Sequence, residues 1–306
     1  MNVLRSFITS LVPLDRVHNG FFIGGILAVY AVAYIIWSAS SSTKSPSLTK
    51  SYHHFPIIAR RIVNQGERPV IFLTVRVSTA SLPTGAHVKV RTTTSNNEES
   101  IIRSYTPTRF DRGECELMFR VYEGGPMSTY LSKLKVGNSI EMQGPTGLER
   151  YASHGPGTFS RGDKVWEGIT HVALVSGGTG ITPMLQIANH VLQDKNDQTK
   201  LSLVSFTTSI ADIMLENELR TLASSSDSRL RLTFVVSKLS TSELRDGIPS
   251  DVRHVSMRDL NSETLETLLN VPIASNTMIC LCGPDGFVAR AKELLLPNFK
   301  NNILVW

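Results

Sequence analysis

Three glycines within four positions, Gly177, Gly178 and Gly180, separate an apolar segment from an amphipathic one. Glycine permits positive φ and allows a ligand to approach the backbone closely. The first amides of a helix lack partners within the helix, and together with the helix dipole they favour an anion. Residues 176–182 are therefore predicted to form a phosphate-binding turn. The alternative is a tight strand-to-helix connection that binds no ligand.

A second glycine turn, Gly124 and Gly125 followed by Pro126, precedes another short segment with helical spacing at residues 127–134. Apolar residues recur there on one face of the predicted helix. Because this turn also opens a helix, it is a second candidate anion site.

Composition and charge exclude several classes of protein. The chain has 306 residues, of which 41% are hydrophobic and 19% charged, as in globular proteins. Four basic residues and one acidic residue among the first fifty account for three of the five excess positive charges. The rest of the chain is nearly neutral, which does not support a nucleic-acid partner. Cys115, Cys280 and Cys282 suggest neither a disulfide framework nor a metal site, so a reducing compartment fits best.

Residues 20–37 form an uncharged apolar run of 18 residues. As a helix the run would reach roughly 27 Å, close to the thickness of a bilayer core. It predicts a single N-terminal membrane anchor, and the alternative is a cleaved signal peptide with the small residues 38–40 after it. Basic residues on both flanks leave the orientation open. The following stretch to residue 50 has the composition of a tether.

Two different periodicities divide the remaining chain. Short strand-like segments separated by turn residues predict an antiparallel β-barrel at residues 51–165, with strands at 70–77, 87–91, 116–122 and 139–143. Strands and helices then alternate, which predicts a doubly wound parallel sheet at residues 166–306. Its strands are expected at 171–175, 201–206, 230–236 and 277–281, and its helices at 184–193, 213–223, 261–270 and 286–295. With the anchor and tether at residues 1–50, the fold is β plus α/β in three parts.

In such parallel sheets, ligands bind at the carboxyl ends of the strands, near the point where the strand order reverses. Residues 176–182 and 282–284 both follow predicted strands. These two segments are therefore expected to converge on one ligand.

Four motifs occur in a fixed order along the chain: Arg-Ser-Tyr-Thr-Pro at 103–107, Gly-Gly-Pro-Met-Ser at 124–128, Gly-Gly-Thr-Gly-Ile-Thr-Pro at 177–183, and Cys-Gly-Pro at 282–284. In order and spacing they resemble the NADH-cytochrome b5 reductase family, over residues 52–306. The resemblance implies an FAD-binding barrel followed by a nicotinamide-binding α/β domain. It also implies hydride transfer from NADH to FAD and passage of single electrons to a haem protein such as cytochrome b5.

The resemblance assigns roles to residues of the first domain. Arg103 would pair with the FAD pyrophosphate, Tyr105 would pack on the isoalloxazine, and Thr106 would hydrogen-bond near flavin N5. A guanidinium suits the first role because its planar fork of donors matches phosphate oxygens. The other residues implied to bind FAD are Pro107, Arg120, Val121, Tyr122, Gly125, Met127 and Ser128.

For the second domain the resemblance implies an NADH site. Its residues are Gly177, Gly178, Thr179, Gly180, Thr182, Pro183, Asp212, Cys282, Gly283 and Pro284. Cys282 would lie beside nicotinamide C4 as a small polarizable group rather than a nucleophile. Asp212 would lie near the adenosine ribose, where a carboxylate favours NADH over NADPH, although it could instead cap the helix that begins beside it.

The resemblance, through the segment Gly85-Ala86-His87, implies that His87 could join Thr106 and Thr182 in a proton path to the reduced flavin. A single histidine on a strand is more often structural, but a group that titrates near neutral pH suits proton transfer. With Cys282 these three complete the predicted catalytic set.

Some positions depart from the family pattern. Pro126 replaces a frequent lysine, Glu216 replaces a frequent basic residue, and Asp-Gly-Phe at 285–287 replaces two prolines and a methionine. Recognition on the adenine side is therefore expected to differ. The chain ends on Trp306, which either contacts cofactor or only packs.

The resulting hypothesis is a membrane-anchored flavoprotein with its catalytic domain facing the cytosol, on the endoplasmic reticulum or the mitochondrial outer membrane. One alternative keeps FAD and NADH but reduces quinone, ferric chelates or another small acceptor. Another is a degenerate member that acts as a membrane-tethered interaction module.

Overall fold

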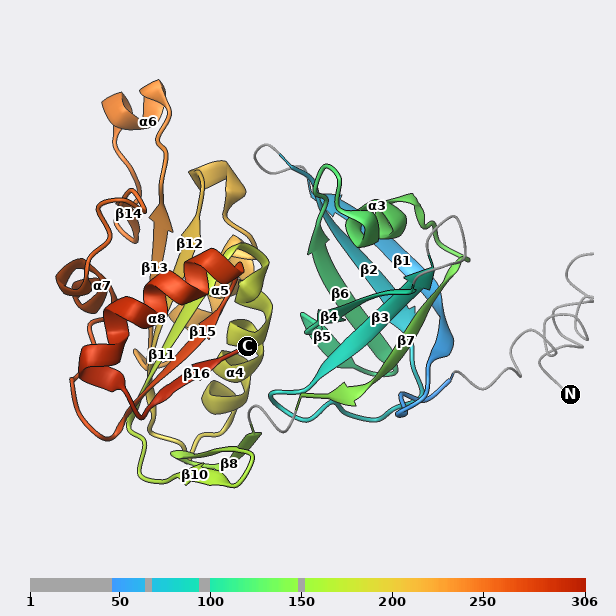
Figure 1. The fold of residues 1–306 in the computed structure, drawn as a ribbon, viewed down its shortest axis with the longest axis horizontal. Helices are drawn as coiled ribbons and strands as arrows, with labels where there is room; N and C mark the ends of the chain where they lie inside the picture. Colours follow the sequence, from blue (N-terminus) through green and yellow to red (C-terminus); the bar gives the residue numbers. More distant parts are fainter. Residues whose placement is uncertain (1–45, 64–67, 94–99, 148–151) are drawn as a thin grey trace, which may run out of the picture. The chain divides into compact units, whose positions relative to one another are not determined.

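The computed structural model describes residues 46–63, 68–93, 100–147 and 152–306 (Figure 1). Residues 46–306 form one compact unit. No helix in these described ranges is long and apolar enough to span a bilayer. The predicted anchor at residues 20–37 lies outside the described residues.

The first half of this unit is an antiparallel sheet, as predicted. Its seven strands follow the order β4-β3-β7-β1-β2-β6-β5. They are β1 (His53–Val63), β2 (Val70–Arg76), β3 (His87–Thr93), β4 (Ser100–Tyr105), β5 (Arg109–Asp111), β6 (Glu114–Arg120) and β7 (Ser139–Thr146). Among the described strands no hydrogen-bonded pair joins β4 to β5, so closure of this sheet into the expected barrel stays a prediction. Fully buried side chains such as Phe55, Leu73 and Ile140 form its core.

Helix α3 (Pro126–Lys133) connects β6 to β7 and begins at the second glycine turn. Pro126 occupies the first turn, where its missing N–H costs nothing. Met127 and Leu131 bury one face against the sheet core, and Arg60 donates to Ser132 O at 3.0 Å in the last turn. The helix predicted at 127–134 is therefore present, displaced by one residue.

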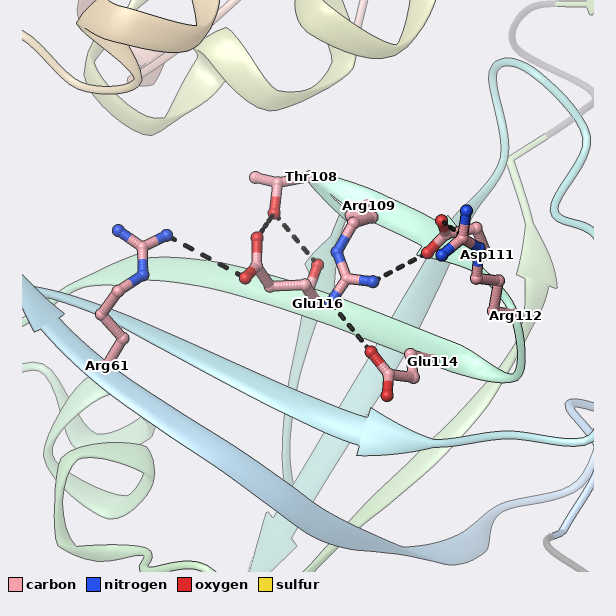
Figure 2. Close-up of polar contacts among 7 residues, drawn as sticks. All are labelled: Arg61, Thr108, Arg109, Asp111, Arg112, Glu114 and Glu116. Carbon is pink, nitrogen blue, oxygen red and sulfur yellow. Dashed lines mark hydrogen bonds and ion pairs between the residues drawn. The ribbon is translucent and has the colours of Figure 1, made fainter.

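A polar cluster secures the segment that follows the 103–107 motif (Figure 2). Thr108 Oγ1 donates to Glu116 Oε1 at 2.6 Å, and the Thr108 amide donates to Glu116 O at 2.9 Å. In the neighbouring β5–β6 hairpin, Arg109 donates to Asp111 at 2.8 Å and to Glu114 at 3.0 Å. These bonds fix where the chain leaves the motif.

A small sheet follows the first large sheet along the chain and precedes the second. The sequence patterns do not predict it. It contains β8 (Ala152–Gly155), β9 (Thr158–Arg161) and β10 (Lys164–Trp166). Trp166 Nε1 donates to Asn302 Oδ1 at 3.1 Å, which attaches this sheet to the C-terminal segment.

The second half is the predicted parallel sheet, in the order β14-β13-β12-β11-β15-β16. Its strands are β11 (His171–Gly177), β12 (Lys200–Thr207), β13 (Leu230–Val236), β14 (Val252–His254), β15 (Thr277–Cys282) and β16 (Ile303–Val305). The chain runs outward from β11 through β12 and then returns to β15 on its other side. The strand order therefore reverses at β11, where both the 176–182 turn and the 282–284 segment begin.

Helices cover both faces of this sheet (Figure 1). Side chains of α4 (Ile181–Gln193) and α5 (Glu216–Ser224) pack into the core on one face, and those of α7 (Ser262–Leu269) and α8 (Asp285–Phe299) pack on the other. The short α6 (Thr241–Asp246), β14 and β16 are not predicted. Helix α4 begins three residues earlier than predicted, because the turn winds through a 3₁₀ segment, η2 (Gly178–Gly180), directly into it.

Candidate active site

A cavity of about 380 Å³ lies at the carboxyl ends of β11 and β15 and is lined by residues from both halves of the compact unit. Its volume falls in the range of small-molecule sites, about 300–1,000 Å³. Residues of the first half on its wall are His87, Arg103, Ser104, Tyr105, Thr106, Met118, Phe119, Arg120, Tyr122, Gly125, Pro126, Met127 and Ser128. Those of the second half are Thr179, Gly180, Thr182, Pro183, Cys282, Gly283 and Trp306.

All four sequence motifs contribute to this wall, but not every predicted site residue does. Pro107, Val121, Gly177, Gly178, Asp212 and Pro284 are absent from it. Sequence reasoning missed Ser104, Met118, Phe119 and Pro126 as lining residues and left the role of Trp306 open. Met118 and Phe119 lie in β6, where the four residues 117–120 are all buried. This strand therefore lacks the alternation of apolar and polar residues that would mark one face.

The three glycines of the 177–180 turn are needed for different structural reasons. A Cβ on Gly180 would lie 2.3 Å from Cys282 O, and one on Gly177 would lie 2.8 Å from the Phe287 ring. Gly178 has φ +56° with open space around its Cβ position. Packing against residues 282–287 therefore requires two of the glycines, and backbone conformation requires the third.

The start of α4 suits an anion. Its N-cap residue is Gly180, which supplies no capping side chain, and Gly180 lines the cavity. Thr182, in the first turn, also lines the cavity, and its hydroxyl donates to Thr179 O at 3.3 Å. The Ile181 amide already donates to Gly178 O within η2, so the donors for a phosphate would be the amides of the turn that neither η2 nor α4 uses.

Arg120 contributes a buried charge to the cavity wall. Its side chain is 9% exposed, and Nη2 donates to Asp212 O at 3.1 Å and lies 3.3 Å from Asp212 Oδ1. Its Nε is buried without a hydrogen-bond partner. A buried donor that lacks a partner is costly, and a phosphate oxygen of a dinucleotide would satisfy it.

Asp212 lies behind Arg120 rather than on the cavity wall. Its Oδ2 accepts from Ser209 Oγ at 2.9 Å, within the short segment η3 (Ile210–Asp212). Helix α5 begins at Glu216, and its N-cap position is Leu215. The alternative that Asp212 caps this helix is therefore wrong.

Two tyrosines and a serine lie on the first-domain side of the cavity. Burial raises the pKa of Tyr105 to about 12, so its phenol stays protonated. Tyr122 is 38% exposed, and the guanidinium of Arg68 lies 5.4 Å from its ring centroid. Ser128 Oγ accepts from the Tyr122 amide at 3.1 Å and donates to Gly125 O at 3.1 Å, so it closes the glycine turn.

His87, Thr106 and Thr182 all lie on the cavity wall and are 7%, 9% and 7% exposed. The imidazole of His87 packs against Gly147, where an added Cβ would lie 2.4 Å from Nδ1. Three hydroxyl or imidazole groups from different elements are thus gathered at one cavity. Their use as a proton path stays a prediction.

Cys282 is the cysteine that reaches the cavity. Burial raises its pKa to about 11, so the thiol is neutral at physiological pH and poorly nucleophilic. Cys115 and Cys280 are fully buried in the cores. A neutral, small side chain at this place fits the packing role predicted for Cys282.

The departures from the family pattern have local explanations. Pro126 starts α3 on the cavity wall. Glu216 pairs with Arg220 at 2.9 Å, and Arg220 also pairs with Asp251. Phe287 packs on Phe206 with ring centroids 5.2 Å apart.

Comparisons with known proteins agree with this architecture. Residues 57–151 match the family described as Oxidoreductase FAD-binding domain, and residues 174–293 match Oxidoreductase NAD-binding domain. NADH-cytochrome b5 reductase 3 of Rattus norvegicus is 35% identical over 235 residues, with 72% of each chain covered. NADH-cytochrome b5 reductase 2 of Danio rerio is 29% identical over 304 residues, which cover 90% of this chain and 93% of the relative.

Among solved structures, the cytochrome b5 reductase domain of Ulva prolifera nitrate reductase superposes with a TM-score of 0.71 at 24% identity. The match covers 86% of this chain and all of that domain, and it shows the shared fold. Both matched domains contribute residues to the wall of the cavity. The chain therefore belongs to the NADH-cytochrome b5 reductase family and is an NAD(P)H-dependent FAD oxidoreductase.

Proposed function

We propose that this chain takes hydride from NADH and passes single electrons to cytochrome b5 or a closely similar haem protein. The observation that carries the proposal is the single cavity whose wall combines the 103–107 and 124–128 motifs with the 177–183 and 282–284 motifs. Hydride transfer needs the two rings in face-to-face contact, and a cavity lined by both domains supports such an arrangement. The family relationship supports the haem acceptor.

FAD, when bound, accepts two electrons together and releases them one at a time. Arg103 and Arg120 would hold its phosphates, with the first amides of α3 as further donors. Tyr105 and Tyr122 would bracket the isoalloxazine, and Thr106 would hydrogen-bond near its N5. His87 and Thr182 would carry the proton that accompanies reduction.

The second domain would bind the nicotinamide nucleotide. Backbone groups of residues 178–182 would hold its pyrophosphate, and Cys282 with Gly283 would flank the ring on the other side. Asp212, held beside Arg120, would disfavour the extra phosphate of NADPH. The expected coenzyme is therefore NADH.

Absorbance spectroscopy tests the first step. The purified protein should be yellow, and its flavin absorbance should bleach when NADH is added without oxygen. A colourless protein that fails to take up added FAD would support the alternative of a non-catalytic module.

Steady-state assays with purified cytochrome b5 and with ferricyanide then test the acceptor. Lys133 and Lys135 are exposed beside α3 and could steer an acidic cytochrome. Replacing both by Glu should raise KM for cytochrome b5 and leave the rate of ferricyanide reduction unchanged. The control Lys195→Glu, at an exposed position of the second domain, should change neither KM for cytochrome b5 nor ferricyanide reduction. Reduction of ferricyanide or quinone with no reduction of cytochrome b5 would favour a small acceptor.

We further propose that residues 20–37 anchor the chain in the endoplasmic reticulum or mitochondrial outer membrane, with the catalytic domain in the cytosol. The apolar run itself supports this. The full chain should resist carbonate extraction from membranes, and residues 46–306 expressed alone should be released. Protease digestion of intact organelles tests the orientation: a protected catalytic domain would exclude the cytosolic side.

A further inference from the structure

One side chain of α4 holds the loop that leads into β3. Gln186 Oε1 accepts from the Gly85 amide at 2.8 Å, and Gln186 Nε2 donates to Ala86 O at 3.0 Å. The partners are about a hundred positions apart in the chain and belong to the two different domains. A primary amide offers an acceptor and a donor side by side, which neither a carboxylate nor a cation does.

Both ends of this contact lead directly to the cavity. Thr182 lies one helical turn before Gln186, on the same side of α4, and lines the cavity. His87 follows Ala86 in the chain and lines the same cavity. The Gln186 amide therefore joins the two segments that bring Thr182 and His87 to the cavity wall.

The elements on either side of the contact are firmly packed. Ala86 is fully buried, and its amide donates to Pro83 O at 3.0 Å in a turn completed by Gly85 at φ +90°. On the other side, α4 buries eight of its 13 residues. A shift at Gln186 would therefore move the whole loop or helix rather than be absorbed locally.

We propose that Gln186 is a positioning residue for hydride transfer, which fixes the distance between the two rings by joining the 82–87 loop to α4. The proposal rests on the hydride step of the proposed function and does not depend on the acceptor. A misplacement of about 1 Å can slow such a reaction about a hundredfold, even when both partners still bind.

The test is anaerobic stopped-flow reduction of the FAD-loaded full chain by NADH, without any acceptor. Gln186→Glu keeps the shape and the acceptor but places an oxygen against Ala86 O. Its reduction rate constant should fall about ten- to a hundredfold. The FAD content, the flavin spectrum and the dissociation constant of NADH should stay close to the wild-type values. The reduction rate constant should show the full deuterium isotope effect when 4-deuterated NADH is used.

Gln193→Glu is the matched control, because it makes the same change at an exposed position at the end of the same helix. Gln186→Met keeps the side-chain volume without a charge and carries the test if the Glu variant loses FAD. A wild-type rate constant in either FAD-loaded variant, or an equal fall in the control, overturns the proposal.

The outcomes also separate this inference from the acceptor assignment. If NADH reduces the wild-type chain but the reduced chain does not reduce cytochrome b5, the assignment of the acceptor is overturned. The positioning role of Gln186 is then still tested by the variants. A wild-type chain that binds FAD but is not reduced by NADH overturns both.

Discussion

At the scale of single residues, the structure distinguishes a glycine that has no room for a side chain from one that has, although the two look alike in the sequence. Gly180 is required because its Cβ position is filled by the backbone of Cys282, whereas Gly286 has nothing within 4 Å of that position. Gly286 lies in the first turn of α8 at an ordinary negative φ. The two positions therefore make opposite predictions for the same substitution.

Gly180→Ala should force residues 282–283 away from the turn, weaken NADH binding at least tenfold and destabilise the protein by about 2 kcal/mol, comparable to other overpacking changes. Gly286→Ala should be neutral or stabilise by about 0.5 kcal/mol, since Ala favours the helix. NADH titration of flavin reduction and thermal unfolding measure both. Equal effects of the two variants would contradict the packing explanation.

Cys282 should alkylate slowly, with a rate that follows its raised pKa. Because the thiolate is the reactive form and the pKa is about 11, the rate should rise about tenfold per pH unit from pH 7 to 10. An ordinary cysteine, with a pKa of about 8.5, would level off near pH 9. Iodoacetamide labelling followed by peptide mass spectrometry measures this, with the urea-unfolded chain as control. A plateau below pH 9 in the folded protein would show that burial does not control this thiol.

At the scale of elements, α4 connects the nucleotide turn to the rest of the second domain. Its N-terminus is left uncapped at the cavity, and its C-terminus is closed by Arg229. The guanidinium donates to Val191 O at 3.2 Å, Leu192 O at 2.8 Å and Asp197 O at 2.6 Å. A cation at this end satisfies carbonyls that have no partner and opposes the helix dipole.

Arg229→Met should lower the free energy of unfolding by about 2 kcal/mol, because it removes charge-assisted bonds to several carbonyls. Arg231→Met, at an exposed position two residues further along, should change stability by less than about 0.5 kcal/mol. Urea unfolding of both FAD-loaded variants tests this. A stability of Arg229→Met equal to wild type would mean that water satisfies those carbonyls as well.

At the scale of the molecule, polar contacts between described residues join the FAD-binding and NAD-binding domains at the cavity. They include the Gln186 amide on Gly85 and Ala86 and the ion pair of Arg120 with Asp212. Both side chains of the ion pair are less than 10% exposed. Removing one partner of such a buried pair is costly, whereas removing both together is often nearly neutral.

Arg120→Met alone should therefore destabilise the chain by about 3 kcal/mol, and Arg120→Met with Asp212→Leu should recover most of that loss. The double variant should still bind FAD more weakly, since the phosphate donor is gone. A double-mutant cycle of urea unfolding at fixed FAD concentration measures the coupling. Additive effects of the two changes would show that the pair contributes nothing to joining the domains.

Much of this architecture was predictable from local patterns. Alternating short strands predict the antiparallel half, and the alternation of strands with 3.6-residue periodicity predicts the parallel half. The small sheet β8–β10 was missed, because it is attached through distant partners such as Asn302. The short α6 was missed although Ser240 and Glu243 form a capping box, because six residues that bury no side chain show no apolar periodicity.

Periodicity in the amino-acid sequence predicts the two architectures, and the resemblance of the four ordered motifs to the NADH-cytochrome b5 reductase family implies the two cofactors. The folded chain was needed to show that Arg120 meets Asp212, that Gln186 holds the loop before His87, and that Met118 and Phe119 line the cavity. Such contacts join residues that are distant in the chain, and strand residues buried on both faces carry no pattern to reveal them.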